Sequence, residues 1–390
     1  MHHSHSLLIS ALACLASAAP ASQQQGLTFS LDTQPISTNG TVVHALEILK
    51  TYNKYNAKAP AAVVNAAKAT GTVNATNIED VLYTVALKIG NQTFNVQFDT
   101  GSSDLWVWSS LQPAAQRKGH TAYVPGKTAT KLKGSTWNVT YASGQGGVGV
   151  VYTDKVSLGS MTVNKQAVEA ATNFKGFKGV PLDGILGMGF RRLESIEPKA
   201  QPTLFDNIKS SLASPLFTSR LRRDAPGTYD FGFIDKTKYT GNISYVNVVS
   251  PKGYWGFNPG SYKIGNKSYT TALGHSIADT GTSLMYLSPK IVALYYAKVS
   301  GAFNSESAGG WVFPCSAKLP AFQITIGTGE FDIGGTNLNA GLVEGQWCFG
   351  GLQSDEGVGG NLLGDVFLRA VFTVWDQSTT PARLGFAKPT

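Results

Sequence analysis

The chain has 390 residues, of which 42% are hydrophobic and 14% charged, and its net charge at pH 7 is +8. This length predicts about two domains, and the hydrophobic content is sufficient for a sizeable core. Few charges and 43 glycines favour an all-β protein with many turns over a helical one. Lys and Arg are dispersed along the sequence, which argues against a nucleic-acid-binding protein.

The first 19 residues have the pattern of a secretory signal peptide. Leu7 to Ala19 is a short apolar run that ends in small residues, although His2, His3 and His5 stand where Lys or Arg is usual. An artificial tag is the alternative interpretation. The run is too short for a membrane helix, and no later run of about 20 apolar residues exists. We therefore expect a secreted, extracellular protein with no stable membrane insertion.

Residues 20–66 lack the Gly-rich and aromatic-rich composition of the rest of the chain, and we interpret them as a propeptide. Within them, Thr41 to Tyr55 has apolar residues at three-residue steps, which predicts a helix. The only Lys or Arg residues of the segment are Lys50, Lys54 and Lys58. Maturation near Asn65 to Lys68 would leave about 324 residues. A solvated linker with scattered lysines is the alternative.

Two β-hairpins are predicted next. Val81 to Ile89 alternates as a strand does, and Gly90-Asn91 turns it into a second strand that ends at Asp99. Further on, Ser135 to Tyr141 and Val148 to Tyr152 flank a glycine-rich apex. This composition suits a mobile flap, and an ordinary surface hairpin is the alternative.

One motif occurs twice, which indicates an internal repeat. Its copies are Asp99-Thr100-Gly101-Ser102-Ser103 and Asp279-Thr280-Gly281-Thr282-Ser283, each between apolar residues. An apolar-apolar-Gly element follows each copy: Asp99 lies 88 residues before Gly187, and Asp279 lies 85 residues before Gly364. Two paired features at nearly equal spacing predict two related lobes, at residues 67–245 and 246–390.

Together, these motifs resemble those of the pepsin-like aspartic endopeptidases over residues 67–390, closest in style to fungal secreted enzymes such as penicillopepsin. The resemblance implies an all-β, bilobal pepsin-like fold in which two β-barrel-like lobes flank an active-site cleft with a flap hairpin. It also implies a monomeric aspartic endopeptidase that acts on polypeptides at acidic pH, is made as a self-maturing zymogen and needs no cofactor or metal.

The resemblance assigns the catalytic roles to Asp99 and Asp279. Two carboxylates a few ångströms apart cannot both ionise cheaply, so they share a proton; this behaviour is established for pepsin and is carried over from it. The ionised member would accept a proton from a water molecule, and the protonated member would donate to the carbonyl oxygen. The supporting positions are glycines for close backbone approach, threonines that hydrogen-bond across the lobes, and hydroxyls that donate to the carboxylates: Gly101, Gly281, Thr100, Thr280, Ser102 and Thr282.

The resemblance also places substrate-binding residues around the flap. Tyr141 matches the flap tyrosine that hydrogen-bonds the tryptophan after the first motif, here Trp106. Ser143, Gly144 and Ile185 are the other expected contacts. Fungal relatives often have Asp where this chain has Ser143, and its absence favours apolar or aromatic residues at the cleaved bond.

In related zymogens a Lys-Tyr pair lies over the catalytic carboxylates, and Lys54-Tyr55 is the candidate here. A basic segment can plug a cleft that holds two carboxylates, and acid would weaken this pairing by protonating them.

Cysteines and glycosylation triplets fit a secreted protein. Cys14 lies in the signal segment, and Cys315 and Cys348 are most simply one disulfide, with two free buried thiols as the alternative. Six Asn-x-Ser/Thr triplets are candidates, of which we expect about half to carry glycans; they start at Asn39, Asn74, Asn91, Asn138, Asn242 and Asn266.

Other functions have less support from the residues. A non-catalytic protein of the same fold that binds a ligand in its cleft is the main alternative. A serine or metal hydrolase is disfavoured, because only His120 and His275 remain outside the leader and propeptide, without Gly-x-Ser-x-Gly or His-Glu-x-x-His. The positive charge could favour anionic substrates, cell walls or membranes, or a higher working pH, and a solvated surface without a partner is the simpler interpretation.

Overall fold

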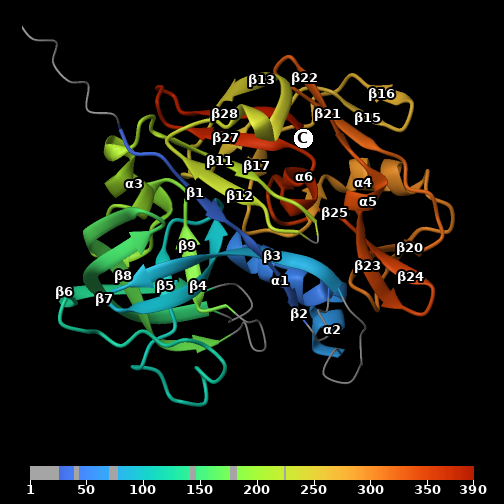
Figure 1. The fold of residues 1–390 in the computed structure, drawn as a ribbon. Coiled ribbons are helices and arrows are strands. Elements are labelled where there is room, and N and C mark those ends of the chain that lie inside the picture. Colours follow the sequence, from blue (N-terminus) through green and yellow to red (C-terminus); the bar gives the residue numbers. More distant parts are fainter. Residues whose placement is uncertain (1–25, 39–43, 70–77, 141–145, 176–181, 224) are drawn as a thin grey trace, which may run out of the picture.

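The computed structural model describes residues 26–38, 44–69, 78–140, 146–175, 182–223 and 225–390 (Figure 1). Within these residues the chain forms mainly strands, arranged in sheets of nine, six, five, four and four strands. The expected all-β class is confirmed. Six short α-helices accompany the sheets in the described part: α1 (His44–Lys54), α2 (Ala61–Ala69), α3 (Leu204–Ile208), α4 (Pro289–Tyr296), α5 (Gly335–Leu338) and α6 (Asp365–Leu368).

The nine-stranded sheet forms most of the N-terminal lobe. Its β3 and β4 are joined by a two-residue turn at Gly90-Asn91, where Gly90 has a φ of 56°, as a tight hairpin requires. Every second side chain of β3 from Tyr83 to Ile89 is buried, so the alternation in the sequence marks the core face. In spatial order the strands are β10 (Ile196–Glu197), β6 (Thr130–Thr140), β7 (Gly146–Leu158), β8 (Met161–Lys175), β5 (Leu105–Val107), β9 (Gly184–Gly187), β4 (Gln92–Asp99), β3 (Ile78–Ile89) and β2 (Gln34–Thr38).

The six-stranded sheet joins the two ends of the chain. Its β11 and β12 come from the end of the predicted N-terminal lobe, and β27 and β28 from the C-terminal end of the chain, so that it links the two lobes (Figure 1). Aromatic rings cover it: Phe98 stacks on Tyr229 with ring centroids 3.8 Å apart. In spatial order the strands are β1 (Phe29–Asp32), β12 (Thr228–Phe231), β11 (Leu216–Arg220), β27 (Phe372–Asp376), β28 (Arg383–Pro389) and β13 (Tyr239–Asn247).

Three smaller sheets build the C-terminal lobe. The five-stranded sheet consists of β14 (Gly256–Phe257), β17 (Ser276–Ala278), β26 (Asn361–Leu363), β18 (Met285–Leu287) and β25 (Leu352–Ser354). One four-stranded sheet consists of β16 (Lys267–Tyr269), β15 (Tyr262–Ile264), β21 (Phe322–Ile326) and β22 (Gly329–Ile333). The other consists of β19 (Phe303–Ser305), β20 (Gly310–Pro314), β24 (Trp347–Gly350) and β23 (Asn339–Glu344).

The internal repeat is visible in the strand pairing. In the first lobe β9 runs parallel to β4 and antiparallel to β5; in the second, β26 runs parallel to β17 and antiparallel to β18. Asp99 pairs with Gly187, and the Asp279 amide donates to the Leu363 carbonyl, one residue before Gly364. A side chain at Gly187 or Gly364 would overlap the backbone at the end of the Asp motif of the same lobe. The equal spacing therefore reflects one strand–turn–strand unit built twice.

Residues 20–66 contain more sheet than the sequence predicts. The expected helix is present as α1, but Phe29–Asp32 adds β1 to the six-stranded sheet and Gln34–Thr38 adds β2 to the nine-stranded one. Phe29 stacks on Phe231 with centroids 4.7 Å apart. Short strands of this kind are fixed by the sheet edge that receives them, so local sequence gives little sign of them.

The predicted segment boundaries stay predictions. The boundary at 66/67 falls within α2, and the boundary at 245/246 falls within β13 of the sheet that links the lobes. No helix in the described ranges is long and apolar enough to cross a membrane.

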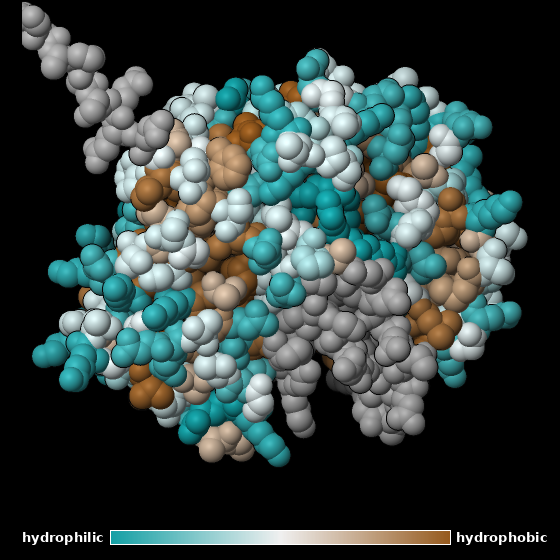
Figure 2. All heavy atoms as spheres, in the orientation of Figure 1, coloured by the Kyte–Doolittle hydropathy of each residue, from teal (hydrophilic) through white to brown (hydrophobic). Residues whose placement is uncertain are grey.

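Positive charge gathers on the N-terminal lobe. Between residues 82 and 190, the described part has seven exposed lysines and no exposed Asp or Glu. Hydrophilic side chains project from this lobe in the lower left of Figure 2. The lysines are Lys88, Lys118, Lys127, Lys131, Lys133, Lys155 and Lys165.

Four of the six glycosylation candidates are exposed, as an acceptor must be. They are Asn91, Asn138, Asn242 and Asn266. Asn39 and Asn74 lie outside the described residues.

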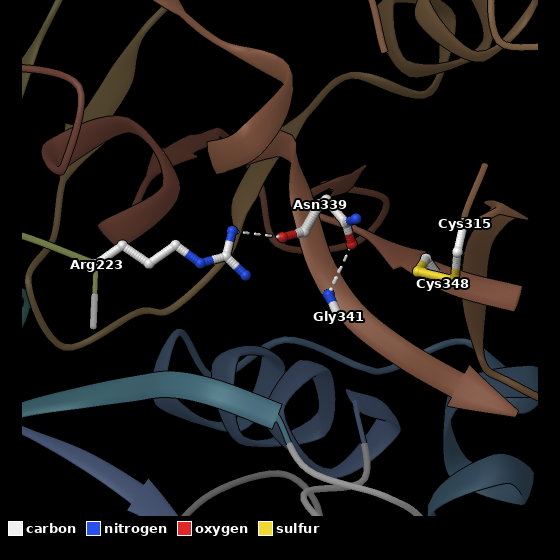
Figure 3. Close-up of a disulfide and its surroundings, with 5 residues drawn as sticks. All are labelled: Arg223, Cys315, Asn339, Gly341 and Cys348. Atoms are coloured by element: carbon white, nitrogen blue, oxygen red, sulfur yellow. Dashed lines mark hydrogen bonds between the residues drawn. A yellow bond between two sulfur atoms is a disulfide. The ribbon is translucent and has the colours of Figure 1, made fainter. Parts of the chain in front are cut away.

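The predicted disulfide between Cys315 and Cys348 is confirmed. Cys348 lies on β24, and Cys315 directly follows β20, its neighbour in the sheet. Figure 3 shows the bond near β23, where the carbonyl of Asn339 accepts a 3.0 Å hydrogen bond from Arg223. The Asn339 side chain accepts another from the Gly341 amide at 2.9 Å.

Replacing both Cys315 and Cys348 by Ser is expected to lower the free energy of unfolding of the C-terminal lobe by roughly 3–4 kcal/mol, because the bond closes a loop of 33 residues. Denaturant unfolding followed by tryptophan fluorescence measures the change. The wild-type protein reduced under the same conditions should match the variant, and equal stability of the oxidised, reduced and variant forms would contradict the prediction.

Candidate active site

The two repeated Asp residues meet although they lie 180 positions apart. Asp99 ends β4 and is 2% exposed, and Asp279 directly follows β17 and is fully buried. A Cβ atom added at Gly101 would overlap the Asp279 carboxylate, and one added at Gly281 would overlap the Asp99 carboxylate. The glycines are therefore required by the close approach of the opposite carboxylate, since neither has a positive φ.

Thr100 and Thr280 fasten the two turns to each other through reciprocal hydrogen bonds. The Thr280 amide donates to Thr100 Oγ1 at 3.0 Å, and the Thr100 amide donates to Thr280 Oγ1 at 3.1 Å. Each hydroxyl in turn donates to a carbonyl of the opposite strand, at Ala278 (3.2 Å) and Phe98 (2.7 Å). All four groups are buried, so the pairing fixes the relative position of the two Asp residues.

Each carboxylate accepts the same pair of hydrogen bonds from its own turn. Ser102 Oγ donates to Asp99 Oδ2 at 2.5 Å, and the Gly101 amide donates to Oδ1 at 2.8 Å. Thr282 Oγ1 donates to Asp279 Oδ2 at 2.5 Å, and the Gly281 amide donates to its Oδ1 at 2.8 Å. The geometry leaves the two Oδ1 atoms facing one space.

The end of α1 fills that space. Lys54 Nζ lies 2.6 Å from Asp99 Oδ1, and 2.8 and 2.9 Å from the two oxygens of Asp279. The hydroxyl of Tyr55 donates to Asp279 Oδ2 at 2.7 Å. The Lys54 ammonium and the Tyr55 hydroxyl thus donate hydrogen bonds to the two carboxylates from the side of α1.

Packing on the C-terminal lobe holds α1 in this position. Its His44 ring stacks on Phe349 with centroids 4.2 Å apart. Thr51 accepts from the Tyr286 hydroxyl at 3.3 Å, and Tyr52 donates to the Ser354 carbonyl at 3.4 Å. Figure 1 shows α1 and α2 between the N-terminal sheet and the strands of the C-terminal lobe.

The charges of this group are strongly coupled. Burial lowers the pKa of Lys54, but the Asp279 and Asp99 carboxylates outweigh it and raise that pKa. Burial raises the pKa of Asp279, but Lys54, Thr282 and Tyr55 bring it down to about 2. The pKa of Asp99 is raised, because burial and the neighbouring Asp279 outweigh the Lys54 ammonium. The two carboxylates therefore titrate as a pair, and the pair takes up one proton in acid well before the second.

Two cavities lie on either side of Lys54 and Tyr55. The larger, about 280 Å³, is on the side of the N-terminal lobe and includes Asp99, Trp106 and Ile185 in its wall. The Trp106 ring is held by Phe174, with centroids 4.4 Å apart. The smaller, about 120 Å³, lies beyond Tyr55 and includes His275 in its wall. Three expected flap residues, Tyr141, Ser143 and Gly144, lie outside the described residues.

Three carboxyl groups that the sequence patterns did not reveal gather behind the larger cavity. Carboxylate oxygens of Asp104, Glu169 and Glu194 lie within 4.8 Å of one another. Burial raises the pKa of Asp104 to about 6 and that of Glu194 to about 8, and it raises the pKa of Glu169 well above its usual range. The three carboxyl groups are therefore largely protonated in acid, and their negative charges repel one another as the pH rises.

This group of three carboxyls is expected to make the protein less stable at neutral pH. Because the folded pKa values are raised, the stabilisation is complete below about pH 4 and is lost as the pH rises towards 8. The Glu169→Gln variant removes one proton-binding group from this set. The melting temperature of the variant minus that of wild type should therefore be several degrees higher at pH 8 than at pH 4.

The matched control for this prediction is Glu306→Gln, which removes the same charge from an exposed side chain. Its melting temperature relative to wild type should not change with pH. A Glu169→Gln difference that stays constant from pH 4 to pH 8 would contradict the assignment.

Comparison with known proteins shows that the chain is similar to aspartic proteases over most of its length. The family model "Eukaryotic aspartyl protease" matches residues 82–389. Penicillopepsin-3 of Penicillium janthinellum is 42% identical over 364 residues, which cover 92% of either chain. Endothiapepsin of Cryphonectria parasitica is 45% identical over 361 residues, or 88% of this chain and 86% of the relative. The crystal structure of an aspartic proteinase from Irpex lacteus has a TM-score of 0.67 and 26% identity, and the match covers 81% of this chain and 98% of that one.

Proposed function

Because the chain belongs to the eukaryotic aspartyl protease family, we propose that it is a secreted aspartic endopeptidase whose catalytic pair is Asp99 and Asp279. The single observation that carries this proposal is the position of Lys54 Nζ, within 2.8 Å of Oδ1 of both Asp residues. A donor that contacts both oxygens at once marks a place where one water molecule could be held by the two carboxyl groups.

The chemistry follows from a shared proton. The ionised carboxylate accepts a proton from the water, whose oxygen attacks the peptide carbonyl carbon. The protonated carboxyl group donates its proton to the carbonyl oxygen, which yields a neutral tetrahedral intermediate. In the collapse of the intermediate, the carboxyl group that took the proton from the water gives it to the leaving nitrogen. The other carboxylate takes up a proton from a hydroxyl of the intermediate, and the C–N bond breaks. Hydrogen bonds from Ser102 and Thr282 support this chemistry by holding the outer oxygens.

Apolar or aromatic residues are the proposed preference at the cleaved bond. Trp106, Val139 and Ile185 support it, because they line the larger cavity beside Asp99. Tyr141, Ser143 and Gly144 remain the proposed flap contacts.

We further propose that the protein is made as a zymogen in which residues 20–66 are the propeptide. The two contacts that support latency are Lys54 on both carboxylates and Tyr55 on Asp279. A cleft closed in this way cannot admit a peptide. Acid would weaken the closure by protonating the carboxylates, which fits an acidic working pH. The secretory pattern of residues 1–19 and the confirmed disulfide support an extracellular location.

The function is tested by acidifying the purified chain to between pH 3 and pH 6 and adding a denatured protein substrate. We expect cleavage that pepstatin blocks and that a chelator and a serine-directed reagent leave unchanged. A protein that binds pepstatin without cleaving any substrate would instead be a non-catalytic binding protein of this fold. Inhibition by the chelator or the serine reagent alone would overturn the proposed chemistry.

A further inference from the structure

Gln97 is a buried polar side chain beside the candidate active site without a visible partner. It lies on β4, two residues before Asp99, and is 1% exposed. Neither its Oε1 nor its Nε2 atom has a hydrogen-bond partner in the described part of the chain. Leaving a buried polar group unsatisfied costs about 1–3 kcal/mol, so the position requires an explanation.

The strand register shows where this amide lies. Gln97 pairs with Ile185 on β9, and Ile185 pairs with Trp106 on β5. Paired residues of neighbouring strands project to the same face, so the three side chains form one row across the sheet. All three line the 280 Å³ cavity, together with Asp99. The unpaired amide therefore borders a space next to the catalytic pair.

The cavity has apolar walls and a polar region. Ile185, Trp106 and Val139 offer apolar surface, whereas Gln97 offers one acceptor oxygen and two N–H donors. In the precursor, residues of α1 and of the turn after it close the space on the side of the propeptide; they are Lys50, Asn53, Lys54 and Asn56. The amide is therefore covered before maturation and faces the cleft once the propeptide has left.

We propose that Gln97 is a specificity-determining residue that selects a substrate side chain ending in a carboxamide, glutamine or asparagine, for this cavity. The inference rests on the proposed function, since the cavity opens to substrate only when the propeptide leaves. The aliphatic stem of the substrate side chain lies along Ile185 and Trp106. Its carboxamide pairs with that of Gln97, where each amide both donates and accepts one hydrogen bond. Only the substrate position whose side chain reaches Gln97 is affected: there an apolar end leaves the buried amide unpaired and is disfavoured. The apolar walls of the cavity still favour apolar or aromatic side chains at the other positions of the cleaved bond.

A charged side chain fits this cavity less well. Among the described residues, the carboxyl groups in the cavity wall are those of Asp99 and Asp104, and burial raises the pKa of Asp104 to about 6. At acidic pH it is largely neutral, so it offers little attraction to an ammonium group.

Peptides that differ by one side chain test the proposal with the mature protein. Six positions around the cleaved bond are scanned one at a time, with Gln compared against Met, which has a similar length and no hydrogen-bonding amide. We expect one position at which wild type prefers Gln to Met by about tenfold in kcat/KM. In Gln97→Met this preference should be lost at that position, while preferences elsewhere and cleavage of the Met peptide persist.

The control variant is Gln346→Met, which makes the same change at an exposed site and should keep the wild-type preference. If no position in wild type prefers Gln, or if Gln97→Met keeps the preference, the inference is wrong although the proposed function stands. If pepstatin-sensitive cleavage is absent for every peptide, the proposed function fails and the inference fails with it. A wild-type scan in which no position prefers Gln overturns the inference even if Gln97→Met does not fold.

Discussion

Asp279→Asn is expected to reduce kcat/KM for peptide cleavage by at least about 10⁴-fold, and Asp99→Asn should do the same. An amide neither accepts the proton of the water nor shares a proton with the other carboxylate, so both halves of the acid–base step are lost. The oxygen of the new amide can still accept a hydrogen bond from either the Gly281 amide or Thr282, which limits the structural change. Steady-state kinetics on a peptide cleaved by wild type measure the effect.

Asp365→Asn provides the matched control for this prediction. Asp365 directly follows the repeated glycine Gly364 and is fully buried. Burial raises its pKa well above the usual range, so the native side chain is already neutral in acid. Its replacement should leave kcat/KM within about threefold of wild type. Retention of more than a tenth of wild-type activity by Asp279→Asn would remove the dyad from the mechanism.

The repeated unit could be predicted from the sequence because its requirements are local. Two such features can be recognised in the sequence. One is a strand that ends in Asp-Thr-Gly, and the other is a glycine that packs against the backbone of that turn. The near-equal separations of Asp99 from Gly187 and of Asp279 from Gly364 then indicate that the unit occurs twice. The meeting of Asp99 and Asp279 does not follow from either copy, and it is inferred from resemblance.

Other features depend on contacts that no short stretch of sequence encodes. Asp104, Glu169 and Glu194 come from separate elements, and each alone looks like an ordinary surface acid. Gln97 gives only a weak signal, as a polar residue between two apolar ones. Its significance depends on the cavity that the register of three strands creates.

The proposed latency predicts that Lys54→Met in the full-length chain raises the pH at which half of the protein is converted to a shorter form by about two units. Removing one partner of a buried ion pair costs about 3–5 kcal/mol, and the two carboxylates recover part of this by taking up a proton. The part of this free energy that the carboxylates do not recover corresponds to a shift of about two pH units in the midpoint, at about 1.4 kcal/mol per unit. Conversion is measured by gel electrophoresis after fixed incubation at a series of pH values.

The pH dependence itself should also change. The pKa of Asp279 is lowered to about 2, so its contact with Lys54 is complete above the ordinary carboxyl pKa near 4 and is lost as the pH falls towards 2. Burial and the neighbouring Asp279 raise the pKa of Asp99, so the pair can take up one proton as the pH falls. When Lys54 leaves, the two carboxylates therefore take up one proton in its place. The equilibrium constant for release of Lys54 should increase about tenfold for each unit by which the pH falls. In Lys54→Met the carboxylates already hold that proton, so the dependence should be shallower.

Two further variants separate the contact from the charge of the segment. Lys58→Met removes an exposed positive charge four residues away and should leave the conversion midpoint unchanged. Tyr55→Phe removes only the hydrogen bond to Asp279 Oδ2 and should shift the midpoint upward by less than Lys54→Met does. Near-ultraviolet circular dichroism at pH 7 establishes that each precursor is folded. Equal shifts for Lys54→Met and Lys58→Met would mean that the charge of the propeptide, rather than the bridge between the two carboxylates, maintains latency.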